Sequence, residues 1–418
     1  MVISPSLPLV SPIHAGGALL STVVRSYLGR GDVVTTVVPS TPSALSDLQL
    51  RDPLSRVYSA GRPRDHRGLR RLLLTAAHRL EPRLRRYDDH LPWPPLALDL
   101  IVNPELRALL RTADVVDLQW EQYARLAPLV HRLAPRARIV ATFHDVLDQV
   151  YERTLERTES PKARWKLRFQ RLRYRHETRC FTRGLHAAFV LSTKDATLLR
   201  AVVPALTPVV VDPPLVTLDT ALLDARHHSP IVAFIGSYNR PENLAAVERL
   251  VGDLWPRIRT AVPHARLSII GGGLSENQAA TWRRTPGVQV TGFLDDLEAA
   301  YREIRVIAAP IDRGAGVKFK ILDAVIRGIP TVTTTVGAEG IDWKLLTHVS
   351  DHDDDLIEAV CDALLHDGPS IDARRNAIMS RNIYSEAAFF ETYQDAINSS
   401  QGHRRKRVSN RMSRRLIS

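Results

Sequence analysis

Residues 309–341 read APIDRGAGVKFKILDAVIRGIPTVTTTVGAEGI, and they hold the clearest structural signal in the chain. An apolar strand ends at Pro310, a loop with Gly314 and Gly316 follows, and a helical pattern opens near Val317. This order is typical of a Rossmann-like unit, in which ligands bind beyond the carboxyl ends of parallel strands. The free N–H groups and positive end of such a helix suit an anion such as a diphosphate.

Three charged residues of this stretch belong to the expected helix. Lys318 and Lys320 lie in its first turn, where cations are unfavourable for the helix alone, so a bound phosphate would explain them. We expect Lys318 to be the point charge that meets the phosphate. Asp323 follows about one and a half turns later, and its carboxylate suits both hydroxyls of a ribose. The alternative is an ordinary helix with a glycine-rich start and local charge pairing.

Short β-rich runs alternate with longer helical patterns in both halves of the chain, which predicts an α/β fold with mostly parallel sheets. The expected strands are residues 2–4, 33–38, 115–119, 139–142, 187–191, 231–235, 267–270, 288–291, 306–310 and 331–334, with second-half helices at 241–260, 294–304 and 317–327. Pro213 and Pro214 separate the halves. We expect doubly wound domains at 1–212 and 213–383, a helix at 384–400 crossing back to the first domain, and a basic disordered tail at 401–418.

Composition narrows the classes of protein that fit. A chain of 418 residues that is 44% apolar is globular and long enough for two domains. The net charge of +12 includes seven cations and no acid within residues 404–415, a tail that is either solvated or in contact with a polyanion. Cys180 and Cys361 form no disulfide or zinc pattern, which favours a cytoplasmic location. The uncharged first 24 residues lack a cationic start and contain three prolines, unlike a signal peptide.

The motifs around the glycine loop occur in a recognisable order. Gly328-Ile329-Pro330 ends the helix, a V-x-T strand follows, and Gly337 and Gly340 flank Glu339 in the next loop. This order resembles glycosyltransferase family 4, the group 1 glycosyltransferases with the GT-B fold, in which two Rossmann-like doubly wound domains face a central cleft. The resemblance is good over residues 231–366 and weaker over the first domain.

The resemblance implies a hexosyltransferase-like enzyme that moves a sugar from a nucleoside-diphosphate sugar, with UDP or GDP, to a glycan, lipid-linked or natural-product acceptor. Transfer would retain the anomeric configuration and use no metal or other cofactor. The family usually has two glutamates here, separated by seven residues, where this chain has Ala315 and Asp323. The implied donor contacts lie in loops and helix starts after strands: Gly17, Gly236, Arg240, Phe293, Gly314, Ala315, Gly316, Val317, Lys318 and Asp323. For Phe293, packing in the core is the alternative.

The first domain would supply the acceptor side. Gly16 and Gly17 precede a helical pattern, and the resemblance places them under the donor phosphates and near the acceptor. His144 and Asp145 directly follow an apolar strand, so we expect them at the edge of the site. We assign His144 and Lys318 to the catalytic site. We expect His144 to contact a sugar hydroxyl rather than to abstract a proton. Gln119 and Trp120 end the preceding strand and are the expected acceptor wall.

Two helices, expected at residues 62–86 and 164–175, are strongly basic, and the sequence leaves open what their basic faces contact. In the second, Trp165, Phe169 and Leu172 recur at helical spacing and are expected to face the core, with the cations facing solvent. A peripheral position on the anionic inner membrane face is the alternative, whereas no motif supports nucleic acid. Ala315 and Ser237 also suit a catalytically degenerate sugar-nucleotide-binding subunit. A GT-B sugar-nucleotide epimerase is the other enzyme alternative.

Overall fold

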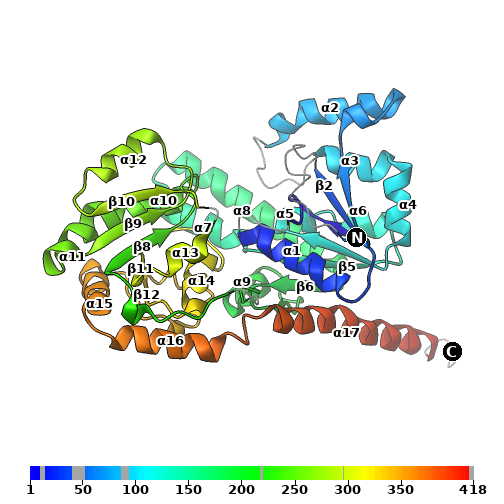
Figure 1. Cartoon of the computed structure of the whole chain (residues 1–418). Coiled ribbons are helices and arrows are strands. Elements are labelled where there is room, and N and C mark those ends of the chain that lie inside the picture. Colours follow the sequence, from blue (N-terminus) through cyan, green and yellow to red (C-terminus); the bar gives the residue numbers. More distant parts are fainter. Residues whose placement is uncertain (10–14, 40–51, 86–93, 217–219, 295, 414–418) are drawn as a thin grey trace. The chain divides into compact units, whose positions relative to one another are not determined.

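The computed structural model describes residues 1–9, 15–39, 52–85, 94–216, 220–294 and 296–413 (Figure 1). The chain forms two compact units, the first of Met1–Val211 with Phe389–Ser418 and the second of Asp212–Ala388. Asp212, which we expected to end the first domain, therefore begins the second unit. Within the described ranges, no helix combines the length and the apolar character needed to cross a membrane.

The first unit is built on a seven-stranded parallel sheet of order β3-β2-β1-β4-β5-β6-β7. The order reverses between β1 and β4, and ligands of such sheets bind at this point, beyond the carboxyl ends of the strands. The expected strands all form, and two more were missed: β3, an edge strand, and β7, which is only two residues long. The strands are β1 Val2–Ile3, β2 Val34–Pro39, β3 Ser55–Ala60, β4 Val115–Gln119, β5 Arg138–Phe143, β6 Ala187–Val190 and β7 Val209–Val210.

Helices join these strands, and their ends follow ordinary capping rules. Asn103 accepts hydrogen bonds from the N–H groups of Glu105 and Leu106, and Pro104 occupies the first helical position of α4. The helices are α1 Ala15–Leu28, α2 Gly68–Arg85, α3 Pro94–Val102, α4 Pro104–Thr112, α5 Glu121–Ala124, α6 Ala127–Leu133, α7 Leu147–Arg157, α8 Pro161–Phe181 and α9 Thr193–Val202, with short 3-10 turns η2 Pro63–Asp65 and η3 Thr182–Gly184.

The outer surface of α8 shows that one sequence prediction, about which face of this helix is buried, was wrong. We expected Trp165, Phe169 and Leu172 to face the core, but their exposed fractions are 71%, 59% and 68%. The buried side of α8 is instead formed by Tyr174 and Phe181 near its carboxyl end, together with Thr178. The prediction failed because a stripe at helical spacing specifies one face of a helix without specifying which face meets the protein.

The C-terminal helix α17, Glu386–Ser413, packs onto the first unit (Figure 1, red). Tyr393 stacks on Phe189 of β6 at 4.1 Å between ring centroids, and its hydroxyl donates to Asp117 of β4 at 2.6 Å. Phe389 is buried beside it. We expected the tail from residue 401 to be disordered, whereas α17 continues to Ser413; residues 414–418 lie outside the described residues.

The second unit has a six-stranded parallel sheet of order β10-β9-β8-β11-β12-β13. Two parallel sheets confirm the α/β prediction, and the strand order again reverses, here between β8 and β11. The expected strands form within one residue at each end, and the two-residue β13 was missed. The strands are β8 Ile231–Ile235, β9 Arg266–Ile270, β10 Val288–Gly292, β11 Val306–Ala309, β12 Thr331–Thr333 and β13 His348–Val349.

The helices of the second unit differ from the prediction mainly at their ends. The helix after the glycine loop, α14, begins at Phe319 instead of Val317, because Lys318 has the non-helical ψ of 86° of an N-cap residue. Gly328 ends α14 with a left-handed φ of 81°. The helices are α10 Pro241–Arg249, α11 Trp255–Ala261, α12 Glu276–Arg283, α13 Leu297–Tyr301, α14 Phe319–Arg327, α15 Asp353–Leu365 and α16 Gly368–Ser380, with the π-helical turn η5 Leu250–Leu254 and 3-10 turns η4 Ala225–His227 and η6 Trp343–Leu345.

Candidate functional site

The glycine loop of the second unit lies where the strand order reverses. It follows β11, whose neighbour β8 is followed by the turn into α10, so the two loops share the carboxyl edge of the sheet. Gly314 and Gly316 have φ values of 104° and 70°, which side chains other than glycine rarely adopt. A Cβ at Gly314 would lie 3.7 Å from Cγ of Glu242 on α10, so the loop runs directly beside the start of that helix.

Lys318 closes the glycine loop onto the start of α14. Its side chain is 9% exposed, and its Nζ donates to the carbonyl oxygens of Gly316 at 2.8 Å and Ala315 at 3.2 Å. The carboxylate of Glu339, in the loop after β12, lies 3.8 Å from the same ammonium. The ammonium is therefore held within the glycine loop by a residue that is itself the N-cap of α14, and the free N–H groups of a helix N-terminus suit an anion.

Lys320 forms a second buried contact that the sequence did not reveal. Its ammonium hydrogen-bonds to the Asn243 side-chain oxygen and lies 4.9 Å from the centroid of the Phe234 ring. Burial lowers the pKa of Lys320 to about 7, against the opposing effect of Glu242. A Cβ at Gly236 would lie 3.1 Å from the Lys320 Nζ, so glycine leaves room for this contact. The only sequence signal was the place of Asn243 in the first turn of α10.

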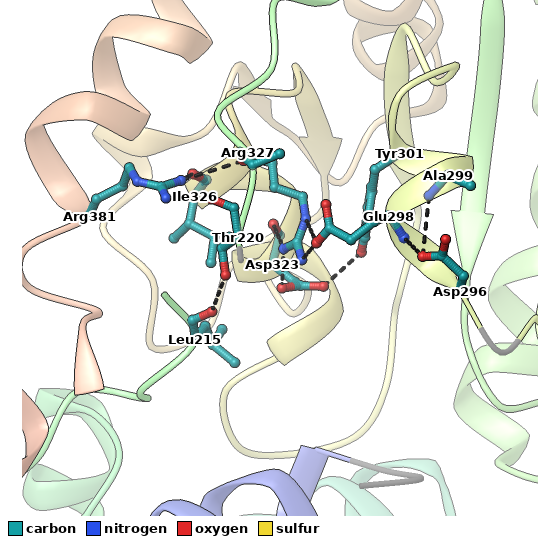
Figure 2. A network of polar contacts seen from close by, with 11 residues as sticks. Leu215, Thr220, Asp296, Glu298, Ala299, Tyr301, Asp323, Ile326, Arg327 and Arg381 are labelled. Atoms are coloured by element: carbon teal, nitrogen blue, oxygen red, sulfur yellow. Dashed lines mark hydrogen bonds and ion pairs between the residues drawn. The ribbon is translucent and has the colours of Figure 1, made fainter. Parts of the chain in front are cut away.

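Asp323 belongs to a largely buried network of four side chains (Figure 2). The Tyr301 hydroxyl donates to Asp323 Oδ2 at 2.9 Å, and the Arg327 guanidinium binds both Asp323 and Glu298. Arg327 also lies 4.6 Å from the centroid of the Tyr301 ring, a cation–π contact. Burial raises the pKa of the Asp323 carboxyl, while Arg327 opposes that rise.

The network does not enclose every oxygen of its carboxylates. The Asp323 side chain is 25% exposed, so part of this carboxylate is accessible to a ligand hydroxyl. Glu298 Oε2 is buried and has no hydrogen-bond partner among the residues that the structure describes. Arg381 extends the network by donating to the carbonyl oxygens of Ile326 and Thr220 (Figure 2). The ribose role assigned to Asp323 stays a prediction, now beside an evident structural role.

Two further expected donor residues lie at the surface of the second unit. The Arg240 side chain is 68% exposed, and its guanidinium lies 3.9 Å from the carboxylate of Glu242 in the first turn of α10. Phe293 is 63% exposed in the loop after β10, which excludes the alternative that it packs in the core. Gly272, in the loop after β9, approaches it, since a Cβ there would lie 3.5 Å from the Phe293 Cβ.

In the first unit, the predicted acceptor residues gather at the carboxyl edge of β4 and β5. The Trp120 ring stacks on His144 at 4.0 Å between centroids and 8° between planes. A Cβ at Gly16 would lie 2.6 Å from Trp120 Cζ2, so this position in α1 requires glycine. Trp120 has a φ of 69°, the one positive φ outside glycine within the described ranges. Such strain is retained where the surrounding packing holds it, often at functional sites.

Gln119 supports this pair from inside the unit, which corrects its expected place in the acceptor wall. The side chain is fully buried. Its amide donates to Asp117 at 2.7 Å and to Thr142 at 3.1 Å, and its oxygen lies 3.4 Å from His144 Nε2. Burial also raises the pKa of Asp117. Gln119 therefore orients His144 through a buried hydrogen-bond network instead of contacting an acceptor.

The two other expected residues of this edge differ in exposure. Gly17 is buried in the first turn of α1, whereas Asp145 is half-buried in the turn between β5 and α7. The negative charge of Asp145 contributes to the raised pKa of Glu121, the residue that follows Trp120. Tyr174 of α8 donates to Glu121 at 2.5 Å and the Leu147 N–H donates at 3.3 Å. Glu121 therefore fastens the loop that carries His144 to α8.

Glu121 predicts a pH dependence of stability. Burial raises its pKa from 4.5 to about 8. Between these values the folded state holds a proton that the unfolded chain has lost, so the free energy of unfolding falls as the pH rises from about 4.5 to about 8. We expect Glu121→Gln to remove about 3–4 kcal/mol of that fall, measured by urea unfolding at pH 5 and pH 8. The exposed Glu105→Gln is the control, and identical pH profiles for wild type and Glu121→Gln would contradict the prediction.

Comparison with known proteins finds a family model that matches part of the second unit. Residues 229–366 match the family model described as Glycosyl transferases group 1. This range contains the glycine loop, Lys318, Lys320 and Asp323. No curated protein sequence matches the chain.

Solved structures share the fold of the whole chain. Sucrose-phosphate synthase from Thermosynechococcus elongatus aligns with a TM-score of 0.67 and 15% identity over 98% of both chains. A mutant of TarM from S. aureus, in complex with Fondaparinux, alpha-GlcNAc-glycerol and UDP, aligns with a TM-score of 0.65 and 9% sequence identity. The alignment covers 95% of this chain and 99% of the TarM chain. An alpha,alpha-trehalose 6-phosphate synthase from Burkholderia multivorans aligns with a TM-score of 0.62 and 13% sequence identity, over 96% of this chain and 98% of the synthase chain. At these identities the likeness concerns the GT-B fold.

Proposed function

We propose that the second unit binds a nucleoside-diphosphate sugar, with UDP or GDP as the nucleotide. The chain is a glycosyltransferase of the GT-B fold, and its residues 229–366 form a group 1 glycosyltransferase domain. One observation carries the proposal. Lys318, the glycine loop and the N-terminus of α14 meet at the strand-order reversal beside β8. Positive groups held at such a crevice are suited to a diphosphate.

The proposed reaction breaks the bond between the anomeric carbon and the donor diphosphate and joins that carbon to an acceptor hydroxyl, with retention of configuration. Negative charge develops on the departing diphosphate. Lys318 and the N–H groups of α14 would stabilise this charge, and because Lys318 is already hydrogen-bonded to its own loop, little reorganisation is needed. Asp323 would hold the ribose through its accessible oxygen. The proposal includes no metal ion and no cofactor.

The first unit would bind the acceptor, a glycan, a lipid-linked sugar or a small natural product. The stacked Trp120 and His144 offer an aromatic edge and a ring nitrogen to a sugar. We include in the proposal a peripheral location at the inner face of a membrane, because α2 and α8 are strongly basic. Such a location suits a lipid-linked acceptor.

Ala315 supports one alternative, a subunit that binds sugar nucleotides without turning them over. The methyl group of Ala315 offers no hydrogen bond to a donor sugar at the place where family 4 usually has a glutamate. In that case the donor would bind through Lys318 and Asp323 and stay intact. Consumption of the donor in the presence of acceptor extracts therefore separates the two functions.

A thermal-shift screen of UDP-, GDP- and dTDP-sugars tests the proposal. A donor present at 100 times its Kd stabilises the folded state by about 2.7 kcal/mol, which raises the Tm by several degrees. We expect one nucleotide series to give this shift and the others to give less. If no sugar nucleotide shifts the Tm at millimolar concentration, the second unit is not a donor site and the proposal is wrong.

A further inference from the structure

The outward face of α8 carries an apolar ridge that no other part of the chain covers among the residues that the structure describes. Trp165, Phe169 and Leu172 are all more than half exposed, and the first two rings stack at 6.2 Å between centroids and 13° between planes. At about 100° per residue, the three side chains project within about 60° of one another. Exposed apolar side chains gathered in this way mark an interaction surface, unlike single exposed leucines.

Cations border this ridge on both sides. Residues 161–181 contain eight lysines and arginines and one acid, Glu177. Relative to Trp165, Lys166 projects about 100° to one side and Arg168 about 60° to the other. Within the part of the chain that the structure describes, Lys162, Lys166 and Arg168 form no ion pair. Their charges are therefore available to a partner.

The opposite face of α8 is firmly attached to the first unit. Arg171 binds both carboxylate oxygens of Asp148 at 2.9 and 2.7 Å, and Tyr174 donates to the buried Glu121. Arg171 also contacts Glu152 at 3.0 Å. Because these contacts use the inner cations and leave the outer ones, the ridge is presented on an already folded helix, so little ordering entropy opposes binding.

We infer that this face of α8 is a docking surface for an anionic lipid bilayer. Tryptophan, phenylalanine and leucine on one face with lysine and arginine beside them are the composition of helices that lie in the membrane interface. The apolar side chains would enter the boundary between headgroups and acyl chains, and the cations would meet anionic headgroups. The inference rests on the proposed peripheral location and names the surface that produces it.

Other occupants fit the charge pattern less well. A symmetric pair of chains would bring two strongly basic faces together, which costs association energy. A single-stranded nucleic acid would need cations along the backbone path between stacking rings, whereas here the apolar ridge occupies the centre of the face and the cations its margins. An anionic bilayer satisfies both the apolar centre and the basic margins.

Vesicle flotation with the full chain tests the inference. Vesicles of phosphatidylcholine with about one third phosphatidylglycerol should bind wild type, and vesicles of phosphatidylcholine alone should bind it much less. We expect Trp165→Ser with Phe169→Ser to lower the partition coefficient at least tenfold. Replacing Lys162, Lys166 and Arg168 by glutamine should lower it about fivefold for each charge removed.

Ile371→Ser with Ile378→Ser on α16 is the matched control, because these side chains are 47% and 55% exposed on a helix that the proposal does not place at the membrane. Circular dichroism and the UDP-sugar thermal shift should match wild type in every variant, so a failure of vesicle binding is distinct from a failure of the donor site. Wild-type flotation of the α8 double variant would overturn the inference, as would equal binding to neutral vesicles. Loss of poly(U) binding without loss of flotation would identify nucleic acid as the partner instead.

Discussion

Replacing Lys318 by alanine is expected to lower kcat/KM for the sugar-nucleotide donor by about 10²–10³-fold, the effect typical of removing one preorganised group that stabilises developing negative charge. Lys318 is largely buried and its ammonium is held 2.8 Å from the Gly316 carbonyl oxygen. If the diphosphate binds at this loop, the neighbouring Lys320 does not replace it at once, because Lys320 is hydrogen-bonded to Asn243 and has a pKa of about 7. The same variant should lose the donor-induced thermal shift.

The measurement needs a control for loop structure, since Lys318 also ties the loop to Glu339. Lys318→Met keeps the aliphatic stem and removes the charge, so it should lose activity as alanine does while its Tm without ligand stays nearer wild type. Lys344→Ala, at an exposed position of the same unit, should leave kcat/KM unchanged. Wild-type kcat/KM and thermal shift in Lys318→Met would remove Lys318 from the donor site.

Replacing Arg327 by methionine is expected to lower the free energy of unfolding by about 3–5 kcal/mol, because it leaves the carboxylates of Asp323 and Glu298 together without their shared cation. The Arg327 side chain is 9% exposed and also packs on the Tyr301 ring, so water does not replace it readily. Urea unfolding followed by tryptophan fluorescence measures the loss.

Arg375→Met is the matched control for this experiment. Arg375 pairs with Asp372 on α16, but both side chains are at least 60% exposed, and such surface pairs contribute about 0–1 kcal/mol. A loss below 1 kcal/mol in Arg327→Met would contradict a structural role for the network. The Asp323 carboxylate would then be available chiefly for a ligand.

Much of the fold could be read from local sequence signals. The strand at 231–235 and the stops at Pro310 and Gly328 are set by apolar runs and by residues that cannot continue a strand or helix, and these act within a few positions. The glycine loop could also be predicted from the sequence, because Gly314 and Gly316 adopt positive φ angles, a backbone conformation that glycine alone tolerates well. Of the three strands that were missed, β7 and β13 have two residues each and leave almost no periodic signal, whereas β3 has six residues at the edge of its sheet.

By itself the sequence determined the two Rossmann-like sheets, the place of the glycine loop between β11 and α14, and Lys318 as its cation. Only the tertiary structure decided the partners of the side chains: Asn243 for Lys320, Arg327 and Tyr301 for Asp323, and Trp120 for His144. It also turned Trp165 and Phe169 outward. The reason is physical, since periodicity fixes which residues share a face, whereas the packing of elements distant in the chain fixes what that face meets.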